Sequence, residues 1–232
     1  MSNFLSHLFS WMLPPGASTF VGEIDWLYYL ILVVTGIAFF VVEIALVVFL
    51  VKYRKRPGQK ATYVHGSTRA EVIWTSVTAV VVVIIGILSA PAWNRIKGRE
   101  GVPPDAMPIE IHAKQFEWNI TYPGTDGKMG TTDDYTVRGQ LHVPVNRPTV
   151  ATLTSEDAIH SFFVPAFRIK QDAVPGMHIR VWFQPTKVGE YELGCAELCG
   201  QGHYRMRAVV TVHTQQDYDQ WVAQQSHSVA QR

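Results

Sequence analysis

Two long apolar runs lie in the first half of the chain, and shorter alternating runs follow them. The first covers residues 27–51 and the second covers residues 72–93. At about 1.5 Å per helical residue, each is long enough to cross a hydrocarbon layer roughly 30 Å thick. The second run is rich in valine and isoleucine, which would suit a buried strand, but its length favours a membrane span. The pattern therefore predicts two membrane helices.

The segment between the two apolar runs is basic. It contains no Asp or Glu, and its six cationic residues are Lys52, Arg54, Lys55, Arg56, Lys60 and Arg69. Positive charge beside a membrane helix favours the cytoplasmic side, so both ends of the hairpin and everything after Trp93 are expected outside the cytoplasm. Residues 1–26 contain no Lys or Arg, so we expect no cleaved signal peptide.

Two carboxylates stand inside or beside the apolar runs. Glu43 lies within the first run, and we expect it to make a polar contact with a partner helix. Glu71 stands at the start of the second run. There it either reaches the water interface or serves a function, because carboxylates at membrane depth are costly.

From Met107 onward the pattern changes to short alternating runs separated by turn residues. Apolar residues alternate around positions 109–120, and similar runs occur at 140–145, 149–154, 178–183, 190–194 and 206–213. Pro, Gly, Asn and Asp punctuate them, which is typical of an antiparallel β-sandwich or small barrel. Residues 124–134 are expected to form a surface loop, residues 215–225 a short helix, and residues 226–232 a frayed end.

These patterns divide the chain into five parts. They are an outer N-terminal segment (1–26), a transmembrane helical hairpin (27–93), a linker (94–106), a β-domain (107–215) and a C-terminal tail (216–232). The 232 residues are 47% hydrophobic and only 17% charged, against roughly 25% charged in soluble domains. The net charge of +1 averages over two halves that differ in local charge, so by itself it says almost nothing about partners. We expect no nucleic-acid partner.

The most informative motif is a cluster of soft ligands. Cys195, Cys199, His203 and Met206 follow one another at spacings of four, four and three, and His160 lies on a separate segment. Thiolate, thioether and imidazole together favour copper, whereas structural zinc sites rarely use Met. A disulfide between the two cysteines is the alternative in an exported domain, but it leaves the histidine and methionine unexplained. Two thiolates can bridge two copper ions, with one histidine for each metal.

On these residues the chain resembles subunit II of the haem–copper cytochrome c oxidases. The resemblance implies a cupredoxin-like, Greek-key β-domain behind the hairpin. It implies a dinuclear copper A centre bridged by Cys195 and Cys199. One copper would be completed by His160 and Met206, the other by His203 and the main-chain carbonyl of Glu197. The resemblance also implies that the Glu197 side chain contacts a magnesium ion shared with subunit I.

Two further stretches resemble the family, and one departs from it. The run from Glu71 to Thr75 resembles the start of the second membrane helix, where a glutamate lies at the entrance of a proton path. Glu156 and Asp157 resemble acidic residues that face cytochrome c. Where the family has Gln-Trp-aromatic-Trp, this chain has Gln115, Phe116, Glu117 and Trp118. The position of electron input from the donor is therefore Phe116, with Trp118 as a second candidate.

The function implied by the resemblance is that of an oxidase subunit through which electrons enter. Electrons from cytochrome c or another external donor would pass through the copper pair to haem in subunit I, where oxygen is reduced to water and protons are pumped. The expected partners are subunit I, further oxidase subunits and membrane lipid, in the plasma membrane of a bacterium with the copper domain outside. The reaction at oxygen must lie in the partner, because neither apolar run contains a histidine to hold haem.

Four other functions share some of these sequence features. The same module could serve a haem–copper nitric oxide reductase, and the sequence leaves that open because the partner sets the reaction. Nitrous oxide reductase has the same copper site in a soluble protein, against which the hairpin argues. A copper-delivery protein needs an open site, and a quinol-oxidase relative lacks the ligands.

The seven histidines other than His160 and His203, among them His142 and His213, are expected to be ordinary surface or core residues.

Overall fold

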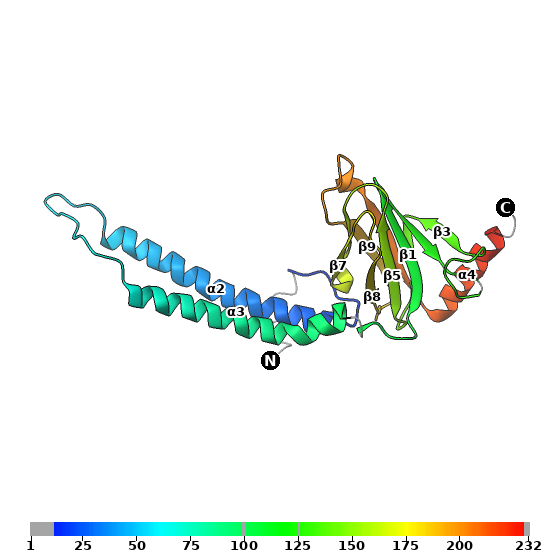
Figure 1. Cartoon of the computed structure of the whole chain (residues 1–232), viewed down its shortest axis with the longest axis horizontal. Helices are drawn as coiled ribbons and strands as arrows, with labels where there is room; N and C mark the ends of the chain where they lie inside the picture. The colour runs from blue at the N-terminus through cyan, green and yellow to red at the C-terminus, as the bar shows by residue number, and fades with distance from the viewer. Residues whose placement is uncertain (1–11, 99–100, 125, 230–232) are drawn as a thin grey trace.

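The computed structural model describes residues 12–98, 101–124 and 126–229, in a long helical hairpin followed by a β-domain (Figure 1). Helix α2 covers Val21–Lys52 and helix α3 covers Thr68–Lys97. Both are long and apolar enough to cross a membrane by length and composition. Helix α2 begins six residues before its predicted apolar run, and α3 extends four residues past its run at each end, because helical hydrogen bonding continues into the polar residues that flank the spans.

The start of α3 has a local cause. Ser67 has an extended backbone, and its side chain accepts a hydrogen bond from the backbone N–H of Ala70 at 3.3 Å. This is a standard N-cap, which satisfies one of the free N–H groups of the first turn. Glu71 lies in that first turn and is exposed. The structure thus places Glu71 at the end of the hairpin that lies away from the β-domain (Figure 1).

The β-domain consists of two five-stranded sheets, which confirms the predicted sandwich. One sheet has the order β3-β2-β1-β5-β8 and the other β4-β10-β9-β6-β7. The strands are β1 (Met107–Lys114), β2 (Glu117–Tyr122), β3 (Tyr135–Arg138), β4 (Gln140–Pro144), β5 (Thr149–Ser155), β6 (His160–Val164), β7 (Ile169–Ala173), β8 (Ile179–Phe183), β9 (Gly189–Cys195) and β10 (Arg207–His213). Residues 124 and 126–134 form no strand, as predicted for a surface loop.

The sheets are mixed, and the expectation of a wholly antiparallel sandwich was wrong on this point. Strands β1 and β5 pair in parallel, as do β4 and β10. Parallel neighbours need a long crossover, and here each pair is joined by a chain segment that contains other strands. The core lies between the sheets. In β1, for example, Ile109, Ile111 and Ala113 point inward and are fully buried.

A short N-terminal segment contributes to this core. Ala17 and Phe20 are fully buried in the same cluster as the inner faces of the sheets. Ala17 N–H donates to the Ala166 carbonyl at 2.8 Å, and the Phe20 ring meets Trp182 edge-on at 4.7 Å between centroids. Because residues 17–20 precede the first membrane helix, this contact ties the base of the hairpin to the β-domain.

A buried ion pair adds to this connection. Arg168, which follows the short 3-10 helix η2 (Pro165–Phe167), donates from Nε to the Asp25 carboxylate at 2.6 Å and from Nη2 to the Pro14 carbonyl at 2.8 Å. Asp25 lies near the start of α2. The pair is mostly buried, so both charges depend on each other for solvation.

The last described element is helix α4 (Gln215–Val229), which continues four residues past its predicted end. The side chain of Tyr218 is buried, and the Trp221 ring packs against Tyr122 at 5.0 Å and His142 at 4.3 Å between centroids. The first part of the predicted C-terminal tail therefore covers one side of the sandwich through Tyr218 and Trp221.

Candidate metal centre

The predicted ligands come together at one end of the second sheet because of its strand pairing. In β6 and β9, Phe162 pairs with Cys195, which places His160 close to the cysteine. On the other side of β9, the Cys195 N–H donates to the Met206 carbonyl at 3.1 Å. The loop between β9 and β10 then brings Cys199 and His203 back over the same point. The short 3-10 helix η3 (His203–Arg205) forms the end of this loop.

The distances between donor atoms define a tight cluster. Cys195 Sγ lies 3.9 Å from Cys199 Sγ, 3.9 Å from His160 Nδ1 and 3.2 Å from the Glu197 carbonyl oxygen. Cys199 Sγ lies 3.7 Å from His203 Nδ1 and 3.8 Å from Met206 Sδ. Ligand atoms of His160, Cys195 and Cys199 all lie within 4.8 Å of one another. Both cysteines are free, so the alternative of a disulfide is not formed here.

The cluster is largely shielded from water. His160 and Met206 are fully buried, Cys199 is almost so, and Cys195 and His203 are half-buried. Burial, followed by the neighbouring Cys195 thiol, raises the pKa of the Cys199 thiol to about 11. A metal ion that binds here must therefore displace a proton from this thiol.

Asp157 orients His160. The His160 Nε2 lies 2.9 Å from an Asp157 carboxylate oxygen, and that carboxylate also accepts the backbone N–H groups of Gln115 at 2.8 Å and Ala158 at 2.6 Å. A carboxylate at Nε2 holds the proton on that nitrogen and leaves the Nδ1 lone pair facing the Cys195 sulfur. Burial by itself would raise the pKa of Asp157, but these hydrogen bonds outweigh it and hold the pKa below its ordinary value.

Gln115 and Phe116 hold the loop in place from the first sheet. The Gln115 side-chain amide donates to the Cys199 carbonyl at 2.5 Å. A Cβ atom at Gly202 would lie 2.4 Å from the Phe116 ring, and one at Gly200 would lie 3.2 Å from it. Phe116 therefore lies flat against the loop, and both positions need glycine. Gly200 also has a φ of 141°, which other residues rarely adopt.

The other predicted residues lie at different distances from the cluster. Trp118 is fully buried beneath it, with its ring centroid 6.2 Å from that of His160. The Glu197 side chain is exposed on the loop, beside Leu198, which is 79% exposed. Glu71 is not brought to the cluster. Sequence reasoning assigned Asp157 to a donor-facing surface and missed its contact with His160, although their spacing of three residues was available as a signal.

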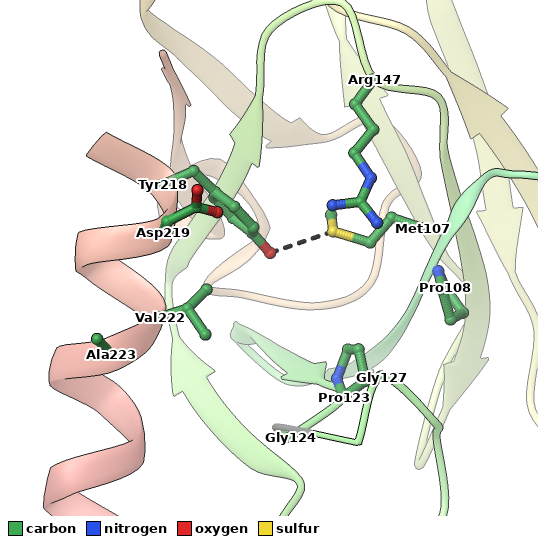
Figure 2. Close-up of a pocket in the computed structure, with 10 residues that line it drawn as sticks. All are labelled: Met107, Pro108, Pro123, Gly124, Gly127, Arg147, Tyr218, Asp219, Val222 and Ala223. Atoms are coloured by element: carbon green, nitrogen blue, oxygen red, sulfur yellow. Dashed lines mark hydrogen bonds between the residues drawn. The ribbon is translucent and has the colours of Figure 1, made fainter. Parts of the chain in front are cut away.

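A cavity of about 620 Å³ lies elsewhere, between α4 and the start of β1 (Figure 2). It sits at the Met107 end of β1, whereas the metal cluster sits beyond the Lys114 end. Arg147 and Asp219 line it, and the Tyr218 hydroxyl donates to Met107 Sδ at 3.1 Å across it (Figure 2). None of its lining residues is a cysteine or histidine, so it is a poor match for the predicted metal chemistry.

Comparison with known proteins gives matches over nearly the whole chain. Residues 6–91 match the family model for the cytochrome c oxidase subunit II transmembrane domain, and residues 109–213 match that for its periplasmic domain. The alternative cytochrome c oxidase subunit 2 of Bradyrhizobium diazoefficiens is 33% identical, with 97% of this chain and 88% of that protein aligned. Cytochrome c oxidase subunit 2 of Thermostichus vulcanus is 30% identical, with 90% and 77% aligned.

A solved structure is also similar. It is the periplasmic domain of subunit II of cytochrome oxidase from Bradyrhizobium japonicum, which is 31% identical. The alignment covers 53% of this chain and 95% of that one, with a TM-score of 0.47.

Proposed function

The chain belongs to the cytochrome c oxidase subunit II family, and we propose that it receives electrons from an external donor and passes them to a haem-bearing partner subunit. The observation that carries this proposal is the buried cluster of thiol, imidazole and thioether donors at the end of the β-domain. Oxygen reduction and proton pumping belong to the partner and to the assembled oxidase. The relatives are named as cytochrome c oxidase subunits, which favours oxygen over nitric oxide as the substrate of that partner.

The donor set fits a dinuclear copper centre. Cys195 and Cys199 supply two sulfur atoms that face each other, and each has one imidazole Nδ1 within 4 Å. Met206 supplies a thioether and Glu197 a carbonyl oxygen. These are soft and borderline donors, which suit copper better than magnesium or calcium. A copper pair held there would accept and release one electron at a time.

The protein's own contribution is to keep this site rigid and dry. Asp157 fixes the ring of His160, and Gln115 and Phe116 fix the loop. Ligands that are already in place need little rearrangement when the charge of a bound metal changes. Phe116 is half-buried against this loop, so we propose it as the contact through which the donor, cytochrome c or another carrier, delivers electrons. Trp118 lies beneath the site and is the second candidate.

Two further roles are proposed by resemblance. The exposed Glu197 carboxylate would share a magnesium ion with subunit I. Glu71, exposed at the end of the hairpin away from the β-domain, would stand at the entrance of a proton path into subunit I. We place the protein in the plasma membrane of a bacterium, with the copper domain on the periplasmic face and the basic loop on the cytoplasmic face.

The copper assignment is tested on the purified full chain loaded with copper. Copper per chain is counted and the electron paramagnetic resonance spectrum is recorded. Two coppers that share one unpaired electron support the proposal, whereas a single copper or zinc contradicts it. His203→Gln should lose this signal, while His178→Gln, which alters an exposed histidine outside the site, should keep it.

The proton role is tested in the assembled oxidase. Glu71→Gln removes the carboxylate and should slow steady-state turnover, because proton uptake is then limited. The rate at which the donor reduces the copper site should stay unchanged, since Glu71 lies in the first turn of α3, at the end of the hairpin away from the β-domain that holds the site (Figure 1). If turnover is also unchanged, the proton role is wrong.

A further inference from the structure

A groove lies between the two membrane helices at their outer end. Its volume is about 490 Å³, and it is lined by α2 residues that include Glu23, Trp26 and Leu27 and by α3 residues that include Leu88 and Arg95. Gly22 also lines it, and a Cβ atom added there would meet nothing within 4 Å. The groove is therefore open space between the helices, large enough for a small-molecule headgroup and the start of a chain.

The groove changes from charged to apolar along the helix axes. Glu23 precedes the first apolar run, which begins at residue 27, and Arg95 follows the second, which ends at residue 93. Leu27 and Leu88 lie within them. Trp26, 46% exposed, stands at the boundary, where tryptophan is typical of the membrane–water interface. The charges thus lie at headgroup level and the leucines at the level of the hydrocarbon.

The charged end has one unused acceptor. Arg95 Nη1 donates to Glu23 Oε1, and this pair joins α3 to α2. Glu23 Oε2 is shielded from solvent and has no hydrogen-bond partner within the part of the chain that the structure describes. A buried carboxylate oxygen without a donor is unfavourable, because it has lost its water and gained nothing in exchange.

We propose that this groove binds a phospholipid with a primary ammonium headgroup, such as phosphatidylethanolamine. The ammonium N–H groups would donate to the Glu23 carboxylate, which lines the groove with its side chain 38% exposed. The phosphate on the same headgroup would accept from Arg95, and one acyl chain would lie along Leu27 and Leu88. A zwitterion matches a neighbouring anion and cation, whereas a choline headgroup has no N–H to donate and an anionic headgroup without an amine would face the Glu23 carboxylate.

An apolar helix of a partner subunit is the competing occupant. It would cover Leu27 and Leu88, but it would bring no donor to the Glu23 carboxylate. The lipid satisfies both ends of the groove. The groove is separate from the metal centre, so a negative result for lipid binding would leave the proposed function unchanged.

The test measures which lipid stays on the protein. The full chain is purified with its oxidase partners and placed in nanodiscs of equal amounts of phosphatidylethanolamine, phosphatidylcholine and phosphatidylglycerol. After mild delipidation, native mass spectrometry counts the lipids retained. We expect one phosphatidylethanolamine, and Glu23→Gln should lower its preference over phosphatidylcholine about tenfold, as for loss of one charge-assisted hydrogen bond. The matched control, Glu43→Gln in the same helix, should leave the preference unchanged.

A second pair of variants tests the acyl-chain end. Leu88→Trp fills the groove and should remove the retained lipid whatever its headgroup, whereas Ile87→Trp, on an exposed position that does not line the groove, should not. Equal retention of ethanolamine and choline lipids by the unmodified chain overturns the headgroup assignment. A photo-crosslinker at Leu88 that captures a partner subunit instead of lipid overturns the site.

Discussion

Two pairs of histidines stand near opposite ends of strand β10, and their surroundings differ in kind. At the start of the strand, His160 and His203 each turn Nδ1 toward a cysteine sulfur, 3.9 and 3.7 Å away. Near its end, His142 and His213 face each other with 2.8 Å between Nδ1 and Nε2, and their rings stack 5.1 Å apart. His142 Nε2 also lies 3.2 Å from the Gln140 side-chain oxygen.

The difference shows how the neighbours of a histidine decide its role. Sulfur is a weak hydrogen-bond partner, so the Nδ1 atoms beside the cysteines keep lone pairs available for a metal. The nitrogens of His142 are occupied by protein groups, and Trp221 lies flat over its ring at 4.3 Å. Burial, and then the neighbouring His213, lowers the pKa of His142 to about 4, and burial also lowers the pKa of His213. The second pair is therefore a neutral packing element.

The largest expected effect separates the two pairs by metal content. Cys199→Ser should abolish the dinuclear copper centre, because a hydroxyl group cannot replace a bridging thiolate. His213→Gln should keep full copper. Both are measured as copper per chain in the purified protein. Copper loss in His213→Gln, or two coppers in Cys199→Ser, would show that the two pairs do not differ as described.

The free energy of unfolding should depend on the packing around the second pair, His142 and His213, whereas the metal site should not. Trp221→Ala removes a half-buried ring that packs on Tyr122 and His142, and should lower the free energy of unfolding by about 2–3 kcal/mol. Thermal unfolding of the full chain in detergent measures it. The copper spectrum of the folded protein should not change. A change in that spectrum would mean that α4 and the metal loop are coupled.

Low pH should lower the folding stability mainly through the second pair of histidines, His142 and His213. The folded pKa of His142, about 4, lies below its ordinary value of 6.5, so the unfolded chain binds a proton between these limits and the folded chain does not. The stability from a neutral His142 is complete above pH 6.5 and is lost as the pH falls toward 4. We expect a loss of about 1–2 kcal/mol after allowance for partial solvent screening.

This effect is checked by unfolding the metal-free chain across that pH range. His142→Gln should flatten the dependence on pH, and His178→Gln should leave it in place. An equal slope in both variants would assign the acid sensitivity to other groups.

The smallest effect tests the weakest donor of the metal cluster. Met206→Leu keeps a side chain of similar size in a fully buried position, so copper should remain bound. Its reduction potential should shift on the order of tens of millivolts, because a weak axial ligand tunes a copper site more than it holds it. A redox titration measures this. An unchanged potential would remove Met206 from the ligand set.

The hairpin, the sandwich and the residues of the donor cluster could be predicted because each has a local signal. Length and apolarity mark the membrane helices, and the unusual ligand types mark the cluster. The sequences of strands β3, β6 and β7 show no clear alternation of apolar and polar residues, so these strands were not predicted. Four of the five residues of β6, for example, are buried, since that strand is covered on both faces at several positions.

Other features depend on contacts between distant segments, which no local pattern reveals. Nothing around Phe20 signals that it enters the core of a domain that begins at Met107, because only the folded chain brings it to Trp182. Asp157 is held in the same way by the backbone N–H of Gln115, a residue 42 positions away along the chain. The parallel pairing of β1 with β5 follows from the path of the whole chain.

The burial of residues 17–20 in the β-domain has a consequence for biogenesis. Residues 17–20 precede the first helix, yet they complete the core of a domain that follows the second, so that core can form only when both flanks of the hairpin lie on the same side of the membrane. A chain with only one of the two helices inserted would leave Phe20 and the β-domain on opposite sides of the membrane, and the core would stay incomplete.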